Sequence, residues 1–509
     1  MNTPYSNYII PVSEIAKPFA SDADSLIETE NANFSTHIGF KKLGIHHVTL
    51  PPGRRTSLPH AESLEEEFVF VISGNPHAWI DGYVYELKPH CAVGFPAGTG
   101  LAHNFINNTD KDVELLVLGE RTKKENLCSF PVNPEQKDTC NIWWSDAPTR
   151  SLGPHNGKPG PIQSEEIGKE WPSCIVDCTQ LKMSKGWHYP GDSETFGEYA
   201  RLTDSLGLKV LGIGFETLAP GKRSAFPHSH KIEEEFVFLL QGIATIWING
   251  FTYEAKPGDG VAFLPGTNIA HAIINNTDEP ILYMVVGEAN DEANEDRIFY
   301  PNHNFRNEQC RKKKIFWDER PSNIVTGTHN GRPTSGIKEH LCLRYVASAD
   351  ENLILDLFKK SANYFKRVEG CEPTLKTVKF AIEDGPKKTV ESYLKEFLLI
   401  EYQDVPIGVV DIHINHPEPG VVYVGLLLIT EELFGKGLGR RAYELVEHYV
   451  QSIFGAKILR LGISDDNDVS GYWKKMGFVP NGKSYSWKGE NKTTNVIEFD
   501  KILSGEKET

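Results

Sequence analysis

An internal repeat limits what this chain can fold into more than any other feature of its sequence. GFKKLGIHHVTLPPGRRTSLPH, which begins at Gly39, aligns with GLKVLGIGFETLAPGKRSAFPH, which begins at Gly207. EEEFVFVISG at Glu65 aligns with EEEFVFLLQG at Glu233, and both pairs share an offset of 168 residues. This period is far longer than the roughly 20–50 residues of solenoid repeats. The repeat therefore indicates that a whole domain has been duplicated.

Each copy of the repeat reads as a series of short β-strands. In the second copy the apolar run 235–240 ends at Gly242, and the runs 245–248 and 251–253 flank Asn249-Gly250. Asn-Gly between two such runs is typical of a two-residue type I′ hairpin turn, and Asp81-Gly82 stands at the same place in the first copy. Short strands separated by Gly and Pro turns predict a small antiparallel β-barrel in each copy.

From about residue 345 the pattern changes to alternating helices and strands, which predicts an α/β domain. We expect an amphipathic helix over 353–368, strands over 397–402, 407–414 and 421–429, a helix over 437–454, a strand over 457–463 and a helix over 468–476. The predicted domain bounds are 1–160, 161–335 and 336–509. Three domains also suit a chain of 509 residues, since domains average roughly 150 residues.

The overall composition excludes several classes of partner. The net charge is −16 and Lys and Arg are not clustered on one long stretch, so nucleic-acid binding is not expected. The N-terminus lacks the pattern of a signal peptide, and no apolar run approaches the length of a membrane span. The eight cysteines are scattered, as in a reduced compartment. We expect a cytoplasmic protein with small-molecule partners and no membrane partner. The oligomeric state is open, with a homodimer as one option.

The second copy carries a set of side chains suited to a metal ion. His228 and His230 are two residues apart, so on a strand both imidazoles face the same side. Glu235 begins the next apolar run, and His271 arrives from a later one. Three imidazoles and one carboxylate suit a divalent ion such as Mn, Fe, Ni, Co or Zn. The alternative is a set of hydrogen-bonded or surface histidines with no metal.

This stretch resembles the two-part signature of the cupin superfamily. The glycine before the first histidine (Gly221), the His-x-His pair, the glutamate, the closing Gly242 and the late histidine all have counterparts. The loops around Gly221 and before the late histidine are slightly longer than in the common pattern. The resemblance implies a cupin barrel in each copy and a metal held by His228, His230, Glu235 and His271.

The first copy has an altered set, in which Glu62 replaces the second histidine. Two imidazoles and two carboxylates suit a harder metal, and the alternative is a site that no longer binds one. The extra acids Glu65 and Glu66 are expected to be solvated. The histidines of the repeated His-Asn-Gly tail, His155 and His329, are expected in turns and not as ligands. The candidate metal ligands of the first copy are His60, Glu62, Glu67 and His103.

The C-terminal region contains a glycine-rich turn between a strand and a helix. The predicted strand 421–429 leads into Gly435-Lys436-Gly437-Leu438-Gly439-Arg440, where the next helix begins. Glycines let the backbone approach a pyrophosphate, and the free N–H groups of a helix N-terminus bind the anion. The pattern is neither a Rossmann fingerprint nor a P-loop. An ordinary glycine-rich turn is the alternative.

A second segment, LRLGISDDNDVSGYWKKMGFV from Leu459 to Val479, makes the pattern more specific. Together the two segments resemble motifs A and B of the GNAT acyltransferase superfamily. The resemblance implies acetyl-CoA as co-substrate and direct attack of an amine on its thioester. Phe434 stands where the family usually has Gln or Arg, and Trp473 where it often has the acidic Tyr. The residues expected to bind the coenzyme are Leu427, Ile429, Gly435, Lys436, Gly437, Leu438, Gly439, Arg440 and Asn467.

The acid and base of this predicted transferase are less determined by the sequence. Tyr472, next to Trp473, is the candidate for protonating the coenzyme thiolate. Asp411 is the candidate for deprotonating the amine, and His413 and Glu418 are alternatives.

Three functional hypotheses follow. The first is an acetyl-CoA-dependent N-acyltransferase for a small amine, joined to a metal-binding cupin pair that binds or processes a small molecule. In the second, the cupin pair is a small-molecule sensor and the transferase domain is its output. In the third, the cupin pair is itself a metal-dependent oxygenase, isomerase or decarboxylase.

Overall fold

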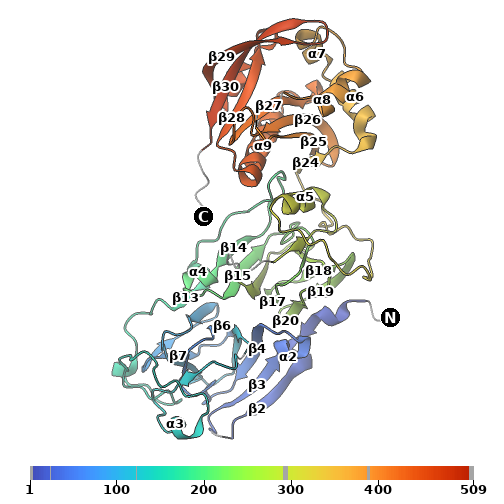
Figure 1. Ribbon diagram of the computed structural model, residues 1–509. Coiled ribbons are helices and arrows are strands. Elements are labelled where there is room, and N and C mark those ends of the chain that lie inside the picture. Colours follow the sequence, from blue (N-terminus) through green and yellow to red (C-terminus); the bar gives the residue numbers. More distant parts are fainter. Residues whose placement is uncertain (1–3, 23, 122, 290–295, 387–389, 504–509) are drawn as a thin grey trace. The chain divides into compact units, whose positions relative to one another are not determined.

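The computed structural model describes residues 4–503 except 23, 122, 290–295 and 387–389 (Figure 1). The chain divides into two compact units. The β unit comprises Met1–Trp187, Phe196–Asn302 and Ile315–Gly336, and the α/β unit comprises His188–Thr195, His303–Lys314 and Ile337–Thr509. The β unit holds both copies of the repeat. Among the described residues no helix has the length and apolar character that crossing a membrane requires.

The first copy consists of a large antiparallel sheet and a smaller one. The large sheet has the order β13 (Ile175–Asp177), β9 (Cys91–Phe95), β6 (Glu67–Ser73), β11 (Val113–Glu120), β4 (Leu43–Leu50), β3 (Glu28–Asn33) and β2 (Ala16–Ala20). The small sheet has the order β10 (His103–Ile106), β7 (His77–Ile80) and β8 (Tyr83–Glu86), and β12 (Cys128–Ser129) pairs with β5 (Ala61–Glu62). The short helices are α1 (Val12–Ile15), α2 (Phe34–Ile38) and α3 (Gln136–Thr139).

The second copy repeats this arrangement. Its large sheet has the order β1 (Ile9–Pro11), β20 (Asp259–Phe263), β17 (Glu235–Gln241), β22 (Ile281–Glu288), β15 (Leu211–Leu218) and β14 (Glu198–Arg201). The small sheet is β19 (Phe251–Ala255), β18 (Ala244–Ile248) and β21 (His271–Ile274); β16 (Ser229–His230) pairs with β23 (Ile298–Phe299), and α4 spans Leu202–Ser205. The antiparallel sheets agree with the prediction. Among the described strands, hydrogen bonds do not close these sheets into a barrel.

The hairpin turns of both copies have the predicted geometry. Asn249 and Gly250 have φ of 45° and 87°, and Asp81 and Gly82 have φ of 46° and 87°, so all four lie in the left-handed region that a type I′ turn requires. The His-Asn-Gly tails form straps at these turns. The indole N–H of Trp79 donates to the backbone oxygen of His155 at 2.8 Å, and Trp247 does the same to His329 at 2.8 Å.

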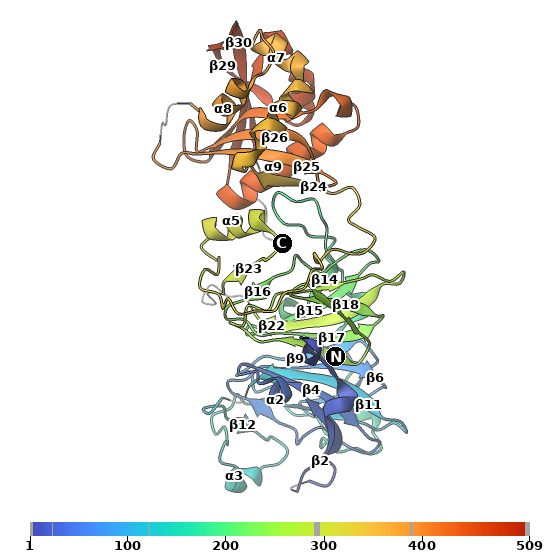
Figure 2. The ribbon, with the colours of Figure 1, turned by 90° about the vertical axis from the view of Figure 1, so that its right-hand side faces the viewer.

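The two copies exchange strands. β1 precedes the first copy in sequence but pairs with β20 of the second, with Ile9 opposite Val261. β13 precedes the second copy but pairs with β9 of the first, with Ile175 opposite Val93. The large sheets lie face to face (Figures 1 and 2), and one apolar core joins them. Its fully or almost fully buried aromatic side chains include Phe34, Phe68, Phe70, Phe236 and Phe238.

The domain bounds predicted from the sequence stay a prediction.

Two buried carboxylates strengthen this contact, and our expectation that the extra acids are solvated was wrong. Glu66 is 3% exposed and Glu234 is 2% exposed. Glu234 accepts the backbone N–H groups of residues 41, 42 and 43 of the first copy at 2.6, 3.1 and 3.0 Å. Glu66 accepts those of residues 209, 210 and 211 of the second copy at 2.7, 2.9 and 3.0 Å. Each copy therefore caps the first long strand of the other.

The α/β unit is built on one seven-stranded sheet. Its order is β24 (Leu341–Tyr345), β25 (Leu394–Tyr402), β26 (Val405–Ile414), β27 (Val421–Ile429), β28 (Ile458–Ser464), β30 (Thr493–Ile502) and β29 (Val479–Lys488). The pair β27 and β28 is parallel, and the other pairs are antiparallel. The helices are α5 (Asn304–Lys312), α6 (Glu351–Lys359), α7 (Ala362–Val368), α8 (Leu375–Glu383), α9 (Leu438–Phe454) and α10 (Ser470–Lys475).

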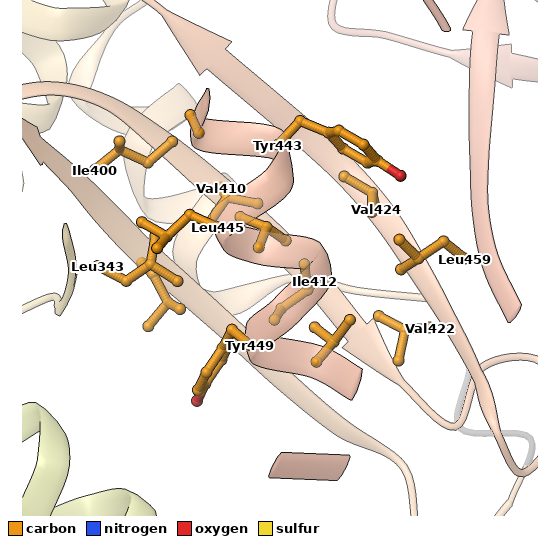
Figure 3. Close-up of a cluster of buried hydrophobic side chains, with 14 of the residues drawn as sticks. Leu343, Ile400, Val410, Ile412, Val422, Val424, Tyr443, Leu445, Tyr449 and Leu459 are labelled. Carbon is orange, nitrogen blue, oxygen red and sulfur yellow. The ribbon is translucent and has the colours of Figure 1, made fainter. Parts of the chain in front are cut away.

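Helices cover both faces of this sheet. Leu398 and Ile400 of β25 share a core with α9, whereas Phe397 and Leu399 share one with α6, α7 and α8. Alternation along the strand explains this division, because successive side chains point to opposite faces. Figure 3 shows the α9 side of the core, with Tyr443, Leu445 and Tyr449 of the helix against Val410, Ile412, Val422 and Val424 of the strands.

Two details of this unit were not predicted from the sequence pattern. The helix expected over 353–368 is divided into α6 and α7 at Ser361, whose fully buried side chain lies against β27, with Oγ 3.5 Å from the Ile429 oxygen. Within the segment 188–195, Asp192 forms an isolated antiparallel bridge with Cys342 of β24, and His340 Nε2 donates to the buried Asp192 carboxylate at 2.9 Å. The sequence places these residues inside the second copy of the repeat, yet they belong to the α/β unit.

We expect Glu234→Ala to destabilise the β unit by about 3 kcal/mol, because three backbone N–H groups lose a charged acceptor in a buried place. The measurement is the free energy of unfolding of the full chain in urea, followed by near-UV circular dichroism. Glu254→Ala, at an exposed carboxylate of β19, is the control. Equal stability of the two variants would contradict the capping role of Glu234.

Candidate functional site

The four predicted ligands of the second copy come together at one end of its sheets. Glu235 begins β17, His271 begins β21, and His230 lies in β16. Glu235 Oε2 lies 2.9 Å from His271 Nε2 and 3.4 Å from His230 Nε2. The His228 ring centroid is 4.9 Å from that of His230 and 5.0 Å from that of His271. The ligand atoms of His228, His230 and Glu235 lie within 4.8 Å of one another, and His271 joins this group through its contact with Glu235.

The other nitrogen of each imidazole is held by a partner. His228 Nδ1 lies 2.8 Å from the Phe226 oxygen, and His230 Nδ1 lies 2.6 Å from Asp296 Oδ2. An Nδ1–H that donates to an oxygen leaves the Nε2 lone pair available for a metal. Phe263 stacks on His271 with ring centroids 3.6 Å apart, which fixes the third ring. The arrangement fits a divalent ion bound through three Nε2 atoms and one carboxylate.

The charges of His228 and Glu235 suit metal binding. Burial, together with the imidazoles of His230 and His271, lowers the pKa of His228 to about 3, so this ring is neutral. Burial alone would raise the pKa of Glu235, but His271 and His230 hold it well below its usual value. A neutral imidazole and an ionised carboxylate are the forms that bind metals. Burial alone would lower the pKa of His230, but Asp296 and Glu235 raise it well above its usual value, so a metal ion must displace a proton from this ring.

The first copy brings three of its four candidates together. His103 Nε2 lies 3.1 Å from Glu67 Oε2, and His60 Nε2 lies 3.7 Å from the same oxygen. His60, Glu67 and His103 have ligand atoms within 4.8 Å of one another, and Glu62 is not part of this group among the described residues. Glu62 faces Cys128 instead, with Sγ 3.9 Å from Oε1. Burial and the Glu67 carboxylate raise the pKa of Glu62 to about 7.

The replacement at Glu62 is matched by a second one beside it. Asp296 Oδ1 accepts the backbone N–H of Ile232 at 2.8 Å, and Asn126 Oδ1 accepts that of Leu64 at 2.9 Å. Asn126 is thus the first-copy counterpart of Asp296. The second copy pairs an imidazole with a carboxylate, whereas the first pairs the Glu62 carboxylate with an amide donor. The two copies therefore differ at both members of the pair, and in each copy the two side chains can form a hydrogen bond with each other.

The glycine-rich turn of the α/β unit forms an open helix N-terminus. α9 begins at Leu438, and its N-cap Gly437 has φ of 78°. Gly435 has φ of 77°, and a Cβ at either glycine would have no heavy atom within 4 Å. A Cβ at Gly439 would lie 3.7 Å from the hydroxyl oxygen of Tyr472. Free helix N–H groups above open space are the elements of an anion site.

β27 provides the predicted strand next to this turn. Its parallel pairing with β28 covers Val421–Val424, so the strand segment with Leu427 and Ile429 lies beyond that pairing. On the other edge, Asp411 pairs with Leu426 and Ile412 with Val424, which leaves Gly425 as an extra residue in β27. This bulge re-aims the strand where it leaves β28.

Asp411 and His413 lie at this bulge. A Cβ at Gly425 would be 3.0 Å from His413 Nε2 and 3.1 Å from Asp411 Oδ2. Asp411 Oδ2 lies 3.3 Å from both His413 Nε2 and Lys395 Nζ, and the Tyr393 hydroxyl lies 2.9 Å from His413 Nδ1. Asp411 Oδ1 is buried and has no hydrogen-bond partner among the described residues. A buried, unpaired carboxylate oxygen is suited to receive a donor from a ligand.

The other candidates of this unit lie near the glycine turn. Tyr472, in α10, has a buried hydroxyl with no hydrogen-bond partner in the part of the chain that the structure describes. Burial, followed by the charge of Glu444, raises its pKa to about 12. Tyr472 is therefore protonated at neutral pH. Asn467 ends a short 3-10 helix (Asp465–Asn467) before α10. Arg440 Nε is paired with Glu444 at 2.8 Å, and Lys436 follows Gly435 in the turn.

Sequence reasoning missed Asp296 and Tyr393. Asp296 lies 66 residues after His230, and its counterpart Asn126 lies two residues short of the repeat offset. Two extra residues in this loop therefore hid the equivalence. Tyr393 lies outside both segments that carry the family resemblance. A search of the sequence for a further carboxylate near the repeated motif could have found Asp296.

Comparison with known proteins identifies the domains. The cupin domain family matches residues 46–119 and 214–287, and the acetyltransferase (GNAT) family matches residues 370–478. No curated protein matches the chain. Among solved structures, a Lactobacillus farciminis oxalate decarboxylase formate complex is 18% identical, with 59% of this chain and 90% of that chain covered and a TM-score of 0.39. An oxalate decarboxylase of Bacillus subtilis is 15% identical, with 59% and 81% covered and a TM-score of 0.38.

We expect His271→Ala to remove most of the bound metal and His103→Ala to remove little, because only the second copy gathers three imidazoles around its carboxylate. The measurement is metal content per chain by mass spectrometry after incubation with Mn²⁺ or Zn²⁺ and desalting. His37→Ala, at an exposed histidine, is the control. Loss of metal in His103→Ala but not in His271→Ala would reverse the assignment.

We expect Asp296→Asn to weaken metal binding about 10- to 100-fold, because Asn has a single acceptor oxygen and cannot accept from both the Ile232 N–H and the Nδ1–H of His230. The converse change is Glu62→His with Asn126→Asp, which gives the first copy the second copy's pair. This double variant should bind more metal per chain than the wild type, and Glu62→His alone should bind less than the double variant. Competition with a chromogenic chelator measures the metal affinity of the wild type and of each variant. An unchanged affinity in Asp296→Asn would contradict this role.

Proposed function

We propose that this chain, which carries two cupin domains and a GNAT acetyltransferase domain, transfers an acetyl group from acetyl-CoA to a small amine. The observation that supports this best is the open N-terminus of α9, with φ of 77° and 78° at Gly435 and Gly437 and free space above both. A pyrophosphate suits this place because the helix N–H groups and the helix dipole both favour an anion. The coenzyme residues would be those of the turn, together with Leu427 and Ile429 of β27 and Asn467.

In the proposed reaction the amine nitrogen attacks the thioester carbonyl, and the C–S bond breaks as the C–N bond forms. Asp411 takes the proton of the amine, with His413 and Lys395 beside its carboxylate. Tyr472 gives its proton to the departing thiolate, since its hydroxyl is protonated and has no other partner. The strand amides of β27 orient the acetyl carbonyl.

For the cupin pair we propose closed barrels and a divalent metal at His228, His230, Glu235 and His271, with Mn, Fe, Ni, Co and Zn as the candidates. The convergence of these four side chains around Glu235 Oε2 supports the proposal. The ion would act as a Lewis acid that binds and polarises a small molecule. The pair is then a metal-dependent enzyme in its own right, such as an oxygenase, isomerase or decarboxylase. A small-molecule sensor whose output is the transferase domain is the alternative.

The remaining proposals concern the surroundings of the protein. We propose small molecules as its partners, to the exclusion of nucleic acids and membranes, and a cytoplasmic location. The net charge of −16 supports the exclusion of nucleic acids. A homodimer is the oligomeric state to test first.

We expect Gly437→Asp to abolish acetyl-CoA binding, because it adds a carboxylate and a side chain where the phosphates would lie. Gly482→Asp is a matched control, since Gly482 is exposed, has φ of 83° and also has free space around its Cβ position. Both variants carry the same backbone strain, but only the first should lose affinity. Isothermal titration of acetyl-CoA measures the difference. Wild-type affinity in folded Gly437→Asp would disprove the site.

A further inference from the structure

A polar pair lies on the inner face of the large sheet of the second cupin domain. Glu216 of β15 stands opposite Tyr283 of β22 in the strand register. Tyr283 is fully buried, and its hydroxyl donates to Glu216 Oε2 at 2.8 Å. Tyr283 belongs to the apolar core of this domain, together with Leu218 on the same face of β15. A carboxyl group is costly in such surroundings, so a structural role alone accounts poorly for it.

On β15 itself, only glycines stand between Glu216 and the level of the metal ligands, whereas Val285 of the neighbouring β22 does carry a side chain on this face. The residues of β15 that share the face of Glu216 are Gly214 and Gly212, and they pair with Val285 and Gly287 of β22. Since Phe236 pairs with Val286, Glu235 lies at the level of Gly287. Along the strand direction, Glu216 and Glu235 thus lie four residues, or about 13 Å, apart.

The Glu216 side chain lies over the glycine side of β15. Its Oε1 lies 3.2 Å from the position that a Cβ of Gly214 would take, so the side chain leans along the strand toward the metal ligands. Its Oε2 is the oxygen that Tyr283 holds. Oε1 is therefore the oxygen turned toward the metal ligands.

The first cupin domain serves as an internal comparison. Its equivalents of Glu216 and Tyr283 are Val48 and Leu115, and His46 stands where the second domain has Gly214. His46 Nδ1 lies 3.0 Å from Asn31 Oδ1, so this imidazole is part of the domain's own hydrogen bonding. The polar pair and a glycine next to the glutamate on the same strand face are thus found together in the domain with the three-imidazole cluster, and the other domain has neither.

The protonation state of Glu216 suits a donor. Burial and then the nearby Glu235 carboxylate raise the pKa of Glu216 to about 7, against the hydrogen bond from Tyr283, which lowers it. Burial and Glu216 raise the pKa of Tyr283 well above its usual value, so its hydroxyl stays protonated and occupies Oε2. Tyr199 of β14, which pairs with Glu216, is the other ionisable residue beside it. Near neutral pH the carboxyl proton is therefore available on Oε1.

We propose that the second cupin domain binds a small organic acid with two oxyanion ends, one at the metal and the other accepting a hydrogen bond from Oε1–H of Glu216. This inference rests on the proposed metal at His228, His230, Glu235 and His271. It adds the chemical class of the ligand and the residue that selects it. Glu216 is a binding residue for the ligand and not a metal ligand.

The test titrates oxalate, the shortest dicarboxylate, into the Mn²⁺-loaded full chain by calorimetry at about pH 6 and about pH 8.5. Wild-type affinity should fall at least about tenfold over this range, because ionised Glu216 repels the second carboxylate. Glu216→Gln should bind oxalate at both pH values as tightly as the wild type does at the lower one, since the amide N–H₂ donates permanently. Glu216→Val, the residue of the first domain, should bind weakly at both.

Controls separate this inference from the metal site on which it rests. Formate, with one carboxylate, should bind equally to the wild type and to Glu216→Val. Gly214→His, which gives the second domain the side chain of His46, should block oxalate. All Glu216 variants should keep the wild-type Mn²⁺ content. Two results would overturn the role of Glu216 and leave the metal site intact. One is a wild type that holds Mn²⁺ but does not bind oxalate, and the other is a Glu216→Gln variant whose oxalate affinity depends on pH as that of the wild type does. Absence of Mn²⁺ from the wild type would overturn the metal site as well.

Discussion

The reciprocal capping of backbone N–H groups by Glu66 and Glu234 is the interaction on which the cupin half of this protein depends. Each carboxylate is buried and satisfies three consecutive amides of the other domain. The next residue along each chain segment, Glu67 or Glu235, points to the opposite face of its strand and belongs to the metal cluster. The contact that holds the two domains together therefore also fixes the start of the strand that carries the metal-binding carboxylate.

The two cupin domains share a framework but differ where chemistry would take place. Hairpin turns, tail straps and the stacking of Phe95 or Phe263 on the late histidine are the same in both, and so is the strand order apart from the additional β2 of the first domain. The differences come in matched sets. An imidazole with a carboxylate in the second domain corresponds to a carboxylate with an amide in the first, and the partly buried Glu216 with Tyr283 corresponds to two aliphatic side chains. Paired changes of this kind keep buried polar groups satisfied, which single changes would not.

The sequence predicted most of the framework because its signals are local. Alternating apolar residues and Asn-Gly or Asp-Gly pairs specify strands and hairpins within a few residues, and the repeat confirms them twice. Contacts between distant segments were not predictable in this way. The burial of Glu66 and Glu234 depends on the partner domain, and the division of the 353–368 helix depends on Ser361 meeting β27. Glu62 was assigned as a ligand from its position, yet its side chain faces Cys128, a contact between distant segments that the spacing of the motif does not reveal.

The exchange of β1 and β13 between the cupin domains has a consequence for how the two sites can differ. If single-domain chains associated through the same exchanged strands, the contact would depend on protein concentration, and symmetry would make both sites identical. A covalent link replaces that bimolecular equilibrium with an intramolecular one of high effective concentration. It also lifts the symmetry constraint, because a substitution then enters one site and not its twin. The chain can thus keep a three-imidazole cluster with its acid in one domain while the other domain retains the shared interface.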